Sequence, residues 1–241
     1  MKASIKKSLF TFFAAASTAA ALVLLAVLPS CNKNPEPDVP NLDDPHMILT
    51  SEVPAFVQIY MSGTGTATIY WGDGKVETFN LQEESLEKTY GIFHSYYSGS
   101  GVTLITGKNI TGLRCNNSKL TSLDASKNAA LLTLDCSCNQ LTNLDVSTIP
   151  YLKNLYCQSN RLISLNVSEN IRLDDLWCQF NQLTSLDLSN NIWLRRLYCG
   201  YNQFTSAALN ALFETLPIHN AKIIPEPTVA TEALQRERAG R

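Results

Sequence analysis

From residue 110 onward, the hydrophobic and polar positions of the chain repeat with a period of 21 residues. The shared unit is LxxLxCxxNxLTxLDxSxNxx, in which a leucine is followed two positions later by a cysteine. This alternation sends leucine and cysteine to one face of a short strand and the residue between them to the other. One unit cannot bury such an apolar edge alone, so the pattern predicts units stacked around a shared core. The repeated positions are Leu113, Leu134, Leu155, Leu176 and Leu197; Cys115, Cys136, Cys157, Cys178 and Cys199; and Ser118, Asn139, Asn160, Asn181 and Asn202.

Two units depart from this pattern. The first has Ser118 in place of the asparagine, and the second has Ile149 and Pro150 where the later asparagine would stand. We expect looser turns at both places.

Before the repeats, alternating apolar and polar residues predict a β-rich segment. The strands are expected at 47–53, 56–61, 66–71, 76–81, 92–97 and 102–106. Only Gly107 and Lys108 separate the last strand from the first repeat. Because the segment is small enough to be marginally stable alone, we expect it to share its core with the repeats and to cover their first coil.

After the repeats, residues 206–216 are predicted to form a helix that covers the last coil. Ser206 is the expected N-cap, and Pro217 stops the helix. The apolar face consists of Leu209, Leu212, Phe213 and Leu216. A short strand is expected at 221–224, followed by a charged tail from residue 225.

The 21-residue unit resembles the leucine-rich repeat superfamily. Within that superfamily, it resembles the cysteine-containing 21-residue repeats of internalin J and of many lipoproteins from Gram-negative anaerobic gut bacteria. Five in-register copies carry the resemblance over residues 110–204. The expected fold is mainly β: a right-handed leucine-rich-repeat solenoid of about five coils, with an N-terminal β-sandwich-like cap and a short C-terminal capping helix.

A second resemblance covers the N-terminal strands. Residues 69–74 read IYWGDG and residues 94–96 read HSY. This is similar to the PKD-type β-sandwich, in which a WGDG-like hairpin turn and a later HxY mark successive strands.

The first 31 residues have the pattern of an export signal. A basic start, MKASIKK, runs into a long apolar stretch that ends at Leu28-Pro29-Ser30-Cys31. This ending resembles the lipobox of bacterial lipoproteins, which implies acylation of Cys31 as the new N-terminus. An uncleaved membrane anchor is the alternative, since about 20 apolar residues cross a bilayer. The Pro-, Asn- and Asp-rich segment that follows favours a tether.

These features divide the chain into a lipoprotein signal peptide (1–30), a flexible tether (31–46), a PKD-like β domain (47–108), the leucine-rich repeats (109–204) and a C-terminal capping helix with its tail (205–241). The lipoprotein resemblance implies a lipid-anchored protein of the outer membrane, exposed at the surface, that meets the membrane only through its anchor. The periplasmic face remains an alternative to the extracellular one.

Charge argues against nucleic acid as a partner. The formal net charge of −2 falls to −5 once Lys2, Lys6 and Lys7 leave with the signal, so phosphate backbones would be repelled.

Catalysis is not expected, because no nucleophile with a neighbouring base, phosphate loop or carboxylate pair occurs in the sequence. Asp73 between two glycines favours a tight turn, and His94 lies in a predicted strand with aromatic neighbours. No cofactor or metal is expected.

The repeated cysteines are predicted to be buried free thiols that fill space in the core. One thiol per coil gives a straight column, whereas zinc requires about four convergent ligands and a disulfide requires a particular torsion. Cys138 differs, because its equivalents in the other coils are expected to be exposed, so we expect it to be the reactive thiol. A second column, of Asp124, Asp145, Asn166 and Asp187, is interpreted as turn caps, with a cation site as the weaker alternative.

Recognition is the remaining function, and leucine-rich repeats bind partners on the sheet face. The last three coils place aromatic residues in the two outward columns of that face, whereas the first two coils place small or polar ones. We therefore predict a protein-binding or adhesion module, with a host or cell-surface protein as partner and a glycan as the alternative. Mutual stacking that only stiffens the sheet is the simpler explanation of the same residues. The predicted ligand-binding residues are Tyr156, Trp177, Phe180, Tyr198, Tyr201, Asp175 and Arg196; the charged pair Asp174 and Arg195 is expected beside them.

The lipobox interpretation predicts that the chain takes up labelled fatty acid and partitions with membranes. Cys31→Ala should lose the label, because the thiol that carries the acyl chain is gone. Metabolic labelling of both proteins measures this, and label retained by Cys31→Ala contradicts the assignment.

Overall fold

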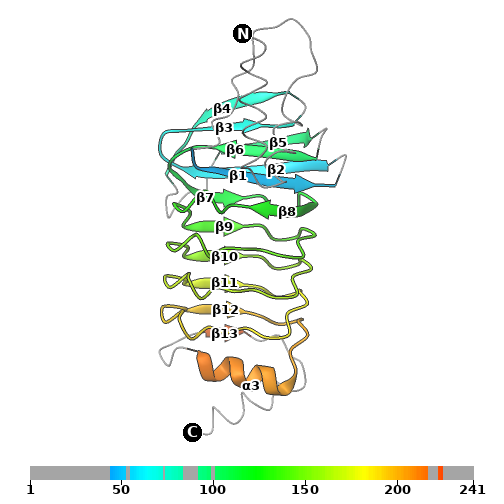
Figure 1. Cartoon of the computed structure of the whole chain (residues 1–241), viewed down its shortest axis with the longest axis vertical. Helices are drawn as coiled ribbons and strands as arrows, with labels where there is room; N and C mark the ends of the chain where they lie inside the picture. Colours follow the sequence, from blue (N-terminus) through cyan, green and yellow to red (C-terminus); the bar gives the residue numbers. More distant parts are fainter. Residues whose placement is uncertain are drawn as a thin grey trace, which may run out of the picture.

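The structure is a computed structural model, and it describes residues 44–52, 55–72, 74–83, 92–98, 101–216 and 222–224. The protein is mainly β and forms an elongated stack of strands with one described helix at its C-terminal end (Figure 1). The predicted signal peptide, most of the tether including Cys31, Asp73 and the residues after Ile224 lie outside the described residues. No described helix is long and apolar enough to cross a membrane.

All six strands predicted before the repeats are present, with ends shifted by at most a few residues. They are β1 (His46–Ser51), β2 (Ala55–Gly63), β3 (Thr66–Tyr70), β4 (Val76–Asn80), β5 (Ile92–Ser98) and β6 (Val102–Thr106). The turn between β3 and β4 contains Gly72 and Gly74 at φ 82° and 92°, where glycine is favoured. Beside it, the buried Trp71 donates from Nε1 to Glu77 Oε2 at 2.6 Å.

The N-terminal strands continue directly into the first coil of the repeats. That coil holds β7 (Ile110–Arg114), which pairs antiparallel with β2, and β8 (Leu120–Asp124), which pairs antiparallel with β1. The result is a five-stranded sheet in the order β4-β3-β6-β1-β8, beside an eight-stranded sheet in the order β13-β12-β11-β10-β9-β7-β2-β5. One hydrophobic cluster runs from Met47 to Leu216, so the expected shared core is confirmed.

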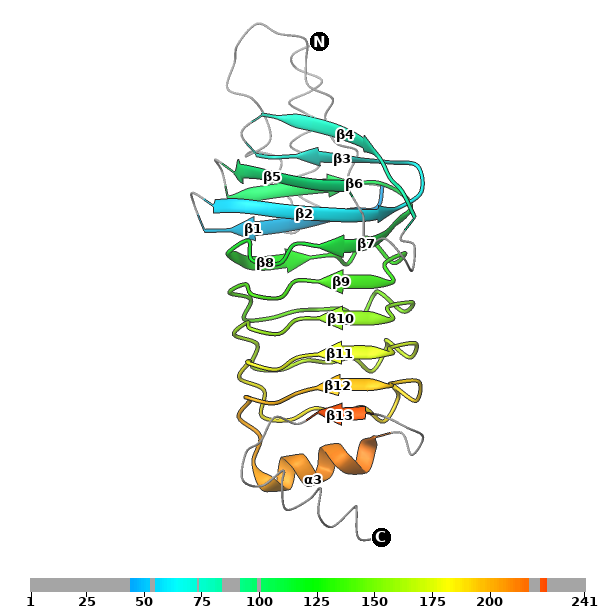
Figure 2. The ribbon, with the colours of Figure 1, turned by 180° about the vertical axis from the view of Figure 1, so that it is seen from behind.

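The later coils each contribute one short strand to the larger sheet. These are β9 (Thr133–Asp135), β10 (Asn154–Tyr156), β11 (Asp175–Trp177) and β12 (Arg196–Tyr198). They pair in parallel with an offset of 21 residues, so that the repeated leucines lie side by side. Figure 2 shows the same stack from behind, with β9 to β12 on successive levels. The predicted leucine-rich-repeat solenoid is therefore confirmed.

In each coil after the first, an asparagine that is largely buried holds successive turns together. In Asn160, Oδ1 accepts from the Leu141 amide at 3.0 Å, and Nδ2 donates to the carbonyls of Cys136 at 2.9 Å and Cys157 at 3.1 Å. Asn139, Asn181 and Asn202 make the equivalent bonds. We call this column the asparagine ladder.

The structure explains why the first coil has a serine, Ser118, where the other coils have an asparagine. The neighbour of this serine is β2 rather than another coil, and Ser118 Oγ accepts from the Gln58 amide at 2.9 Å. A short hydroxyl thus replaces the side-chain amide where the pairing strand is antiparallel.

The turn at Ile149, which was expected to be looser than the others, is held by hydrogen bonds. The Ile149 amide donates to Val146 at 3.1 Å, and Asn170 Nδ2 donates to the Ile149 carbonyl at 2.9 Å.

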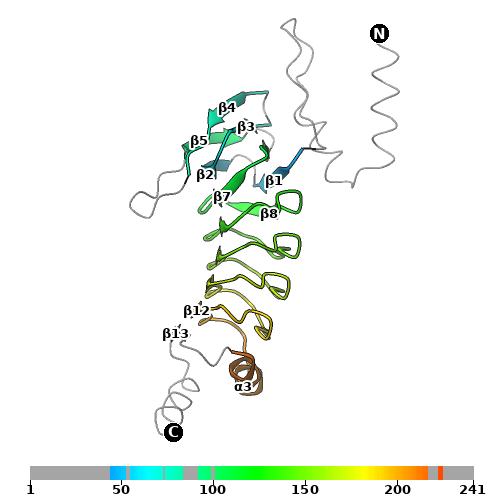
Figure 3. The same cartoon turned by 90° about the vertical axis from the view of Figure 1, so that its left-hand side faces the viewer.

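The C-terminal cap consists of α3 (Ser206–Thr215) and β13 (Lys222–Ile224), which pairs in parallel with β12. Both elements were predicted, but the N-cap was assigned wrongly. It is Thr205, whose Oγ1 accepts from the Ala208 amide at 3.1 Å, because the helix already includes Ser206. Leu209 and Leu212 are buried, and Figure 3 shows α3 beside the last coil at the end of the stack.

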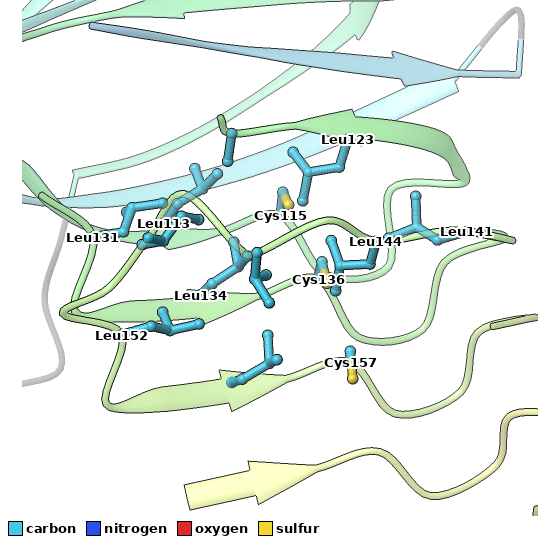
Figure 4. Close-up of a cluster of buried hydrophobic side chains, with 14 of the residues drawn as sticks. Leu113, Cys115, Leu123, Leu131, Leu134, Cys136, Leu141, Leu144, Leu152 and Cys157 are labelled. Carbon is cyan, nitrogen blue, oxygen red and sulfur yellow. The ribbon is translucent and has the colours of Figure 1, made fainter. Parts of the chain in front are cut away.

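The five repeated cysteines form a column in the core, and Figure 4 shows the first three, Cys115, Cys136 and Cys157, on successive coils. All five are buried and free. Burial raises the pKa of each of these thiols, that of Cys199 to about 12. Buried, protonated thiols pack as small apolar groups. Cys138 is also free, and it is exposed.

We expect Asn160→Ala to destabilise the protein by at least about 3 kcal/mol, because three buried backbone groups lose their partner at roughly 1–3 kcal/mol each. Urea titration measures the free energy of unfolding. Asn166→Ala is the matched control: Asn166 is exposed and accepts only from the Ser168 amide, so its loss should cost about 1 kcal/mol or less. Equal losses in the two variants would contradict the role of the ladder.

In the folded ectodomain, prepared without Cys31 and its lipid, a maleimide should modify Cys138 quickly and the five core cysteines only after unfolding, because burial keeps these five protonated and shielded. Mass spectrometry over time measures both phases. Cys138→Ser should remove the fast phase alone. If unfolding without reductant releases fewer thiols than these six, some of them are joined as disulfides.

Candidate functional site

The outward side of β10, β11 and β12 carries the first column of aromatic residues. Tyr156, Trp177 and Tyr198 lie at equivalent positions of the three strands. The rings of Tyr156 and Trp177 meet edge to face at 5.2 Å, and those of Trp177 and Tyr198 are tilted at 4.6 Å. All three side chains are half-buried. These three rings therefore lie on the outward side, as the sequence pattern predicted. Much of their surface is in contact with the neighbouring rings.

The second column follows each core cysteine by two residues, in a tight turn. It consists of Asn117, Cys138, Ser159, Phe180 and Tyr201, whose φ angles are 53°, 54°, 57°, 56° and 53°. Phe180 and Tyr201 are stacked, with ring centroids 4.3 Å apart and planes 7° apart, and each is 49% exposed. Left-handed backbone is unusual for bulky residues and costs roughly 1–2 kcal/mol per residue. Two aromatic side chains are thus held out from the turn at an energetic cost.

Two bidentate ion pairs cross from β11 to β12 beside the rings. Arg196 binds Asp175, and Arg195 binds Asp174. The Asp175 side chain is only 1% exposed, whereas that of Arg196 is 52% exposed. Asp175 therefore positions Arg196 and is shielded from a ligand, while Arg196 is open to one. The hydrogen bonds that Arg196 donates to Asp175 raise the pKa of Arg196, and those that Arg195 donates to Asp174 lower the pKa of Asp174.

The same face contains polar atoms without partners. Trp177 Nε1, Gln158 Oε1 and Gln179 Oε1 are shielded from solvent and have no hydrogen bond to any described residue. Tyr156 Oη lies 3.5 Å from Asp175 Oδ2, and burial, followed by the Asp175 charge, raises the pKa of Tyr156. We define the sheet-face site as Tyr156, Trp177, Phe180, Tyr198, Tyr201 and Arg196, with Asp175 beneath Arg196.

The aspartate column on the opposite side of each coil consists of turn caps, as interpreted. Asp124, Asp145, Asn166 and Asp187 each accept on Oδ1 from the amide of the serine two residues later, at 2.9–3.0 Å. Hydrogen bonds from the side chain and the amide of Ser147 lower the pKa of Asp145, and those from the amide and the side chain of Ser189 lower the pKa of Asp187. Among the described residues no cluster of His, Cys, Asp and Glu is arranged to hold a metal ion.

A further set of exposed residues was not found from the sequence. It lies on the turns that precede β10, β11 and β12 and comprises Tyr151, Ile171, Arg172, Ile192 and Trp193. The Arg172 guanidinium lies over the Tyr151 ring, 5.0 Å from its centroid. The signal was present as apolar residues at the turn positions Ile171 and Ile192, 21 residues apart. We call this set the turn ridge.

No protein-family model and no curated protein matches the chain. Among solved structures, it is similar to the functional domain of InlJ from Listeria monocytogenes, which includes a cysteine ladder. Identity is 37% over 44% of this chain and 24% of that chain, and the TM-score is 0.40. A leucine-rich-repeat protein of Leptospira interrogans is 28% identical over 47% of this chain and 32% of that chain, with a TM-score of 0.38.

An internalin (InlF) from Listeria monocytogenes is 18% identical over 46% of this chain and 34% of that chain, with a TM-score of 0.38. The chain thus spans a third or less of the length of most of these proteins. Its own 21-residue coils and parallel strands define it as a leucine-rich-repeat protein. This class commonly mediates protein–protein interaction.

Proposed function

We propose that the protein is a non-catalytic recognition module at the cell surface, which binds a protein partner through the sheet-face site. The observation that carries this proposal is the placement of Phe180 and Tyr201 in left-handed turns. The same conformation occurs in the earlier coils with asparagine, cysteine or serine, so the two bulky aromatic side chains, and not the turn itself, distinguish the last two coils; the cost of placing them there supports a functional role. Asparagine would fit the same turn with less strain, as Asn117 does in the first coil at φ 53°.

The chemistry of the site favours a protein partner. Aromatic residues and arginine are the residue types that most often dominate protein interfaces, and here Arg196 lies on β12, two residues before Tyr198 of the first aromatic column. The unpaired Trp177 Nε1 supplies a hydrogen-bond donor, and Gln158 and Gln179 supply acceptors. A partner that displaces the covering side chains and offers both donors and acceptors, as a peptide chain does, would recover the cost of leaving them unpaired.

A glycan is the second candidate, because aromatic rings also stack on sugars. The parallel stack of Phe180 on Tyr201 supports it less well, since each ring already uses one face against the other. An outer-membrane, lipid-anchored location and an adhesive role belong to this proposal. They rest on the lipobox at Cys31 and on the resemblance to surface lipoproteins.

The variant Phe180→Asn/Tyr201→Asn should weaken partner binding at least tenfold without lowering the melting temperature. Large aromatic groups at an interface centre can each contribute about 2 kcal/mol or more, and 1.4 kcal/mol is one decade in Kd. The lost stacking, about 0.5–1.5 kcal/mol, is offset by relief of left-handed strain. A protein array and a glycan array identify the partner, and interferometry measures its Kd.

Ser159→Asn is the matched control, because it makes the same substitution at the same turn position one coil earlier, where the wild type has no aromatic side chain. It should bind normally. Trp177→Ala is less informative, because it also removes two ring contacts that stabilise the fold. If the double variant unfolds at a lower temperature and binds as before, the aromatic columns serve only as scaffold.

A further inference from the structure

The turn ridge exposes large apolar side chains where turns ordinarily carry polar ones. Ile192 and Trp193 are 64% and 67% exposed, Ile171 is 54% exposed and Tyr151 is 49% exposed. Single exposed hydrophobic residues are common on proteins, but here they recur on three successive turns. Since the ladder and the leucine core already stabilise these coils, folding does not require apolar residues at the turn tips.

These turns are held rigidly. The amides of Leu152, Leu173 and Leu194 donate to the carbonyls three residues earlier at 3.2, 2.9 and 3.0 Å. Asn191 Nδ2 donates at 3.0 Å to the carbonyl of Asn170 in the preceding turn. The apolar side chains therefore cannot retreat into the core by a local change of the backbone. The turns that carry them lie on successive coils, about 4.8 Å apart, on the side from which β10, β11 and β12 start (Figure 1).

Basic residues accompany the apolar tips. Arg172 and Lys153 are exposed, and Arg195 is exposed while paired with Asp174. Glu169 is the neighbouring exposed acid on the Ile171 turn. These three cations and two carboxylates give the turn ridge and its surroundings a small positive net charge. Tyrosine, tryptophan, isoleucine and arginine together are typical of the boundary between lipid headgroups and acyl chains.

We infer that the turn ridge lies against a lipid bilayer with anionic headgroups. Ile192 and Trp193 enter the boundary between headgroups and acyl chains, and Arg172 and Tyr151 lie at the level of the headgroups. A row of three turn tips is small compared with the roughly 800 Å² that each partner buries in a stable protein interface. A fluid lipid surface adapts to convex tips and needs no complementary pocket. Membrane contact thus extends beyond the lipid anchor expected from the sequence.

The chain length outside the described structure permits this contact. The segment 32–43 separates Cys31 from the first described residue, Asp44, and it can reach at most about 43 Å. The coils from Leu113 to Leu197 extend over only about 19 Å at 4.8 Å per strand. An anchor at Cys31 is therefore compatible with a solenoid that rests on its side.

The test uses the full-length chain reconstituted in vesicles of phosphatidylcholine and phosphatidylglycerol brominated in the upper acyl chain. We expect bromine to quench the emission of Trp193. The emission that remains should then have its maximum at a shorter wavelength. Trp193→Phe should abolish most of the quenching, because Trp71 is fully buried and Trp177 lies on the sheet face. Ile171→Ser/Ile192→Ser should lower it by withdrawing Trp193, and Arg172→Gln should do so more weakly.

Ile163→Ser is the matched control, because Ile163 is 63% exposed but lies on the turn at the other side of its coil. It should leave quenching unchanged. Absence of quenching in the wild type, its persistence in Trp193→Phe, or an equal loss in Ile163→Ser would each overturn the inference. Because every protein in this assay is already attached to the vesicle, anchoring and ridge contact are measured separately, and binding at the sheet-face site does not enter.

Discussion

The buried side-chain amide of the asparagine ladder is the interaction on which the solenoid depends. After each core cysteine the chain leaves the sheet, and its backbone amides and carbonyls there face an apolar interior. One asparagine per coil binds three such groups, two from the preceding coil and one from its own. Unpaired, each of these groups would cost roughly 1–3 kcal/mol. The coils can therefore stack only with this turn in one conformation.

That constraint determines the geometry of the sheet-face site. Since the ladder fixes the turn, the residue before the asparagine has a φ between 53° and 57° in each of the last four coils, whatever its side chain. Side chains at this position consequently project in parallel, one strand spacing apart. Phe180 and Tyr201 can stack with planes 7° apart for this reason. The ladder fixes the backbone, and the outward residues are free to vary with function.

The parts of the fold that repeat were predictable from the sequence, because leucine, cysteine and asparagine recur where burial leaves little choice. The junctions were harder to predict. Leu120–Asp124 forms a strand only because β1 pairs with it, whereas residues 141–145 of the next coil, without such a neighbour, do not. The serine at position 118 likewise became intelligible through its contact with Gln58. Such contacts join segments about 60 or more residues apart and leave no local pattern.

The candidate site was predictable to the same degree. Alternation identified the outward residues of the strands and so located the first aromatic column, whereas the 21-residue register located the second. It did not reveal that Asp175 is covered by Arg196, because both residues occupy outward positions and only side-chain packing separates them. The turn ridge was not predicted, because the periodicities of helices and strands do not apply to the residues of a turn. Comparison of the same turn position across coils, at Pro150, Ile171 and Ile192, would have found it.

The sheet-face site and the turn ridge belong to the same three coils but lie on different sides of them. Along each coil the ridge comes first, at the turn, followed by the charged band of Asp174 and Arg195 and then by the aromatic columns. If the ridge rests on a bilayer, the outward sheet face stands beside the membrane and stays open to a partner. Rigid turns make this division of roles consistent, because one backbone geometry holds both surfaces at a fixed orientation. A partner recognised at the sheet face would then be met close to the membrane surface, with the lipid contact limiting the orientations that the solenoid samples.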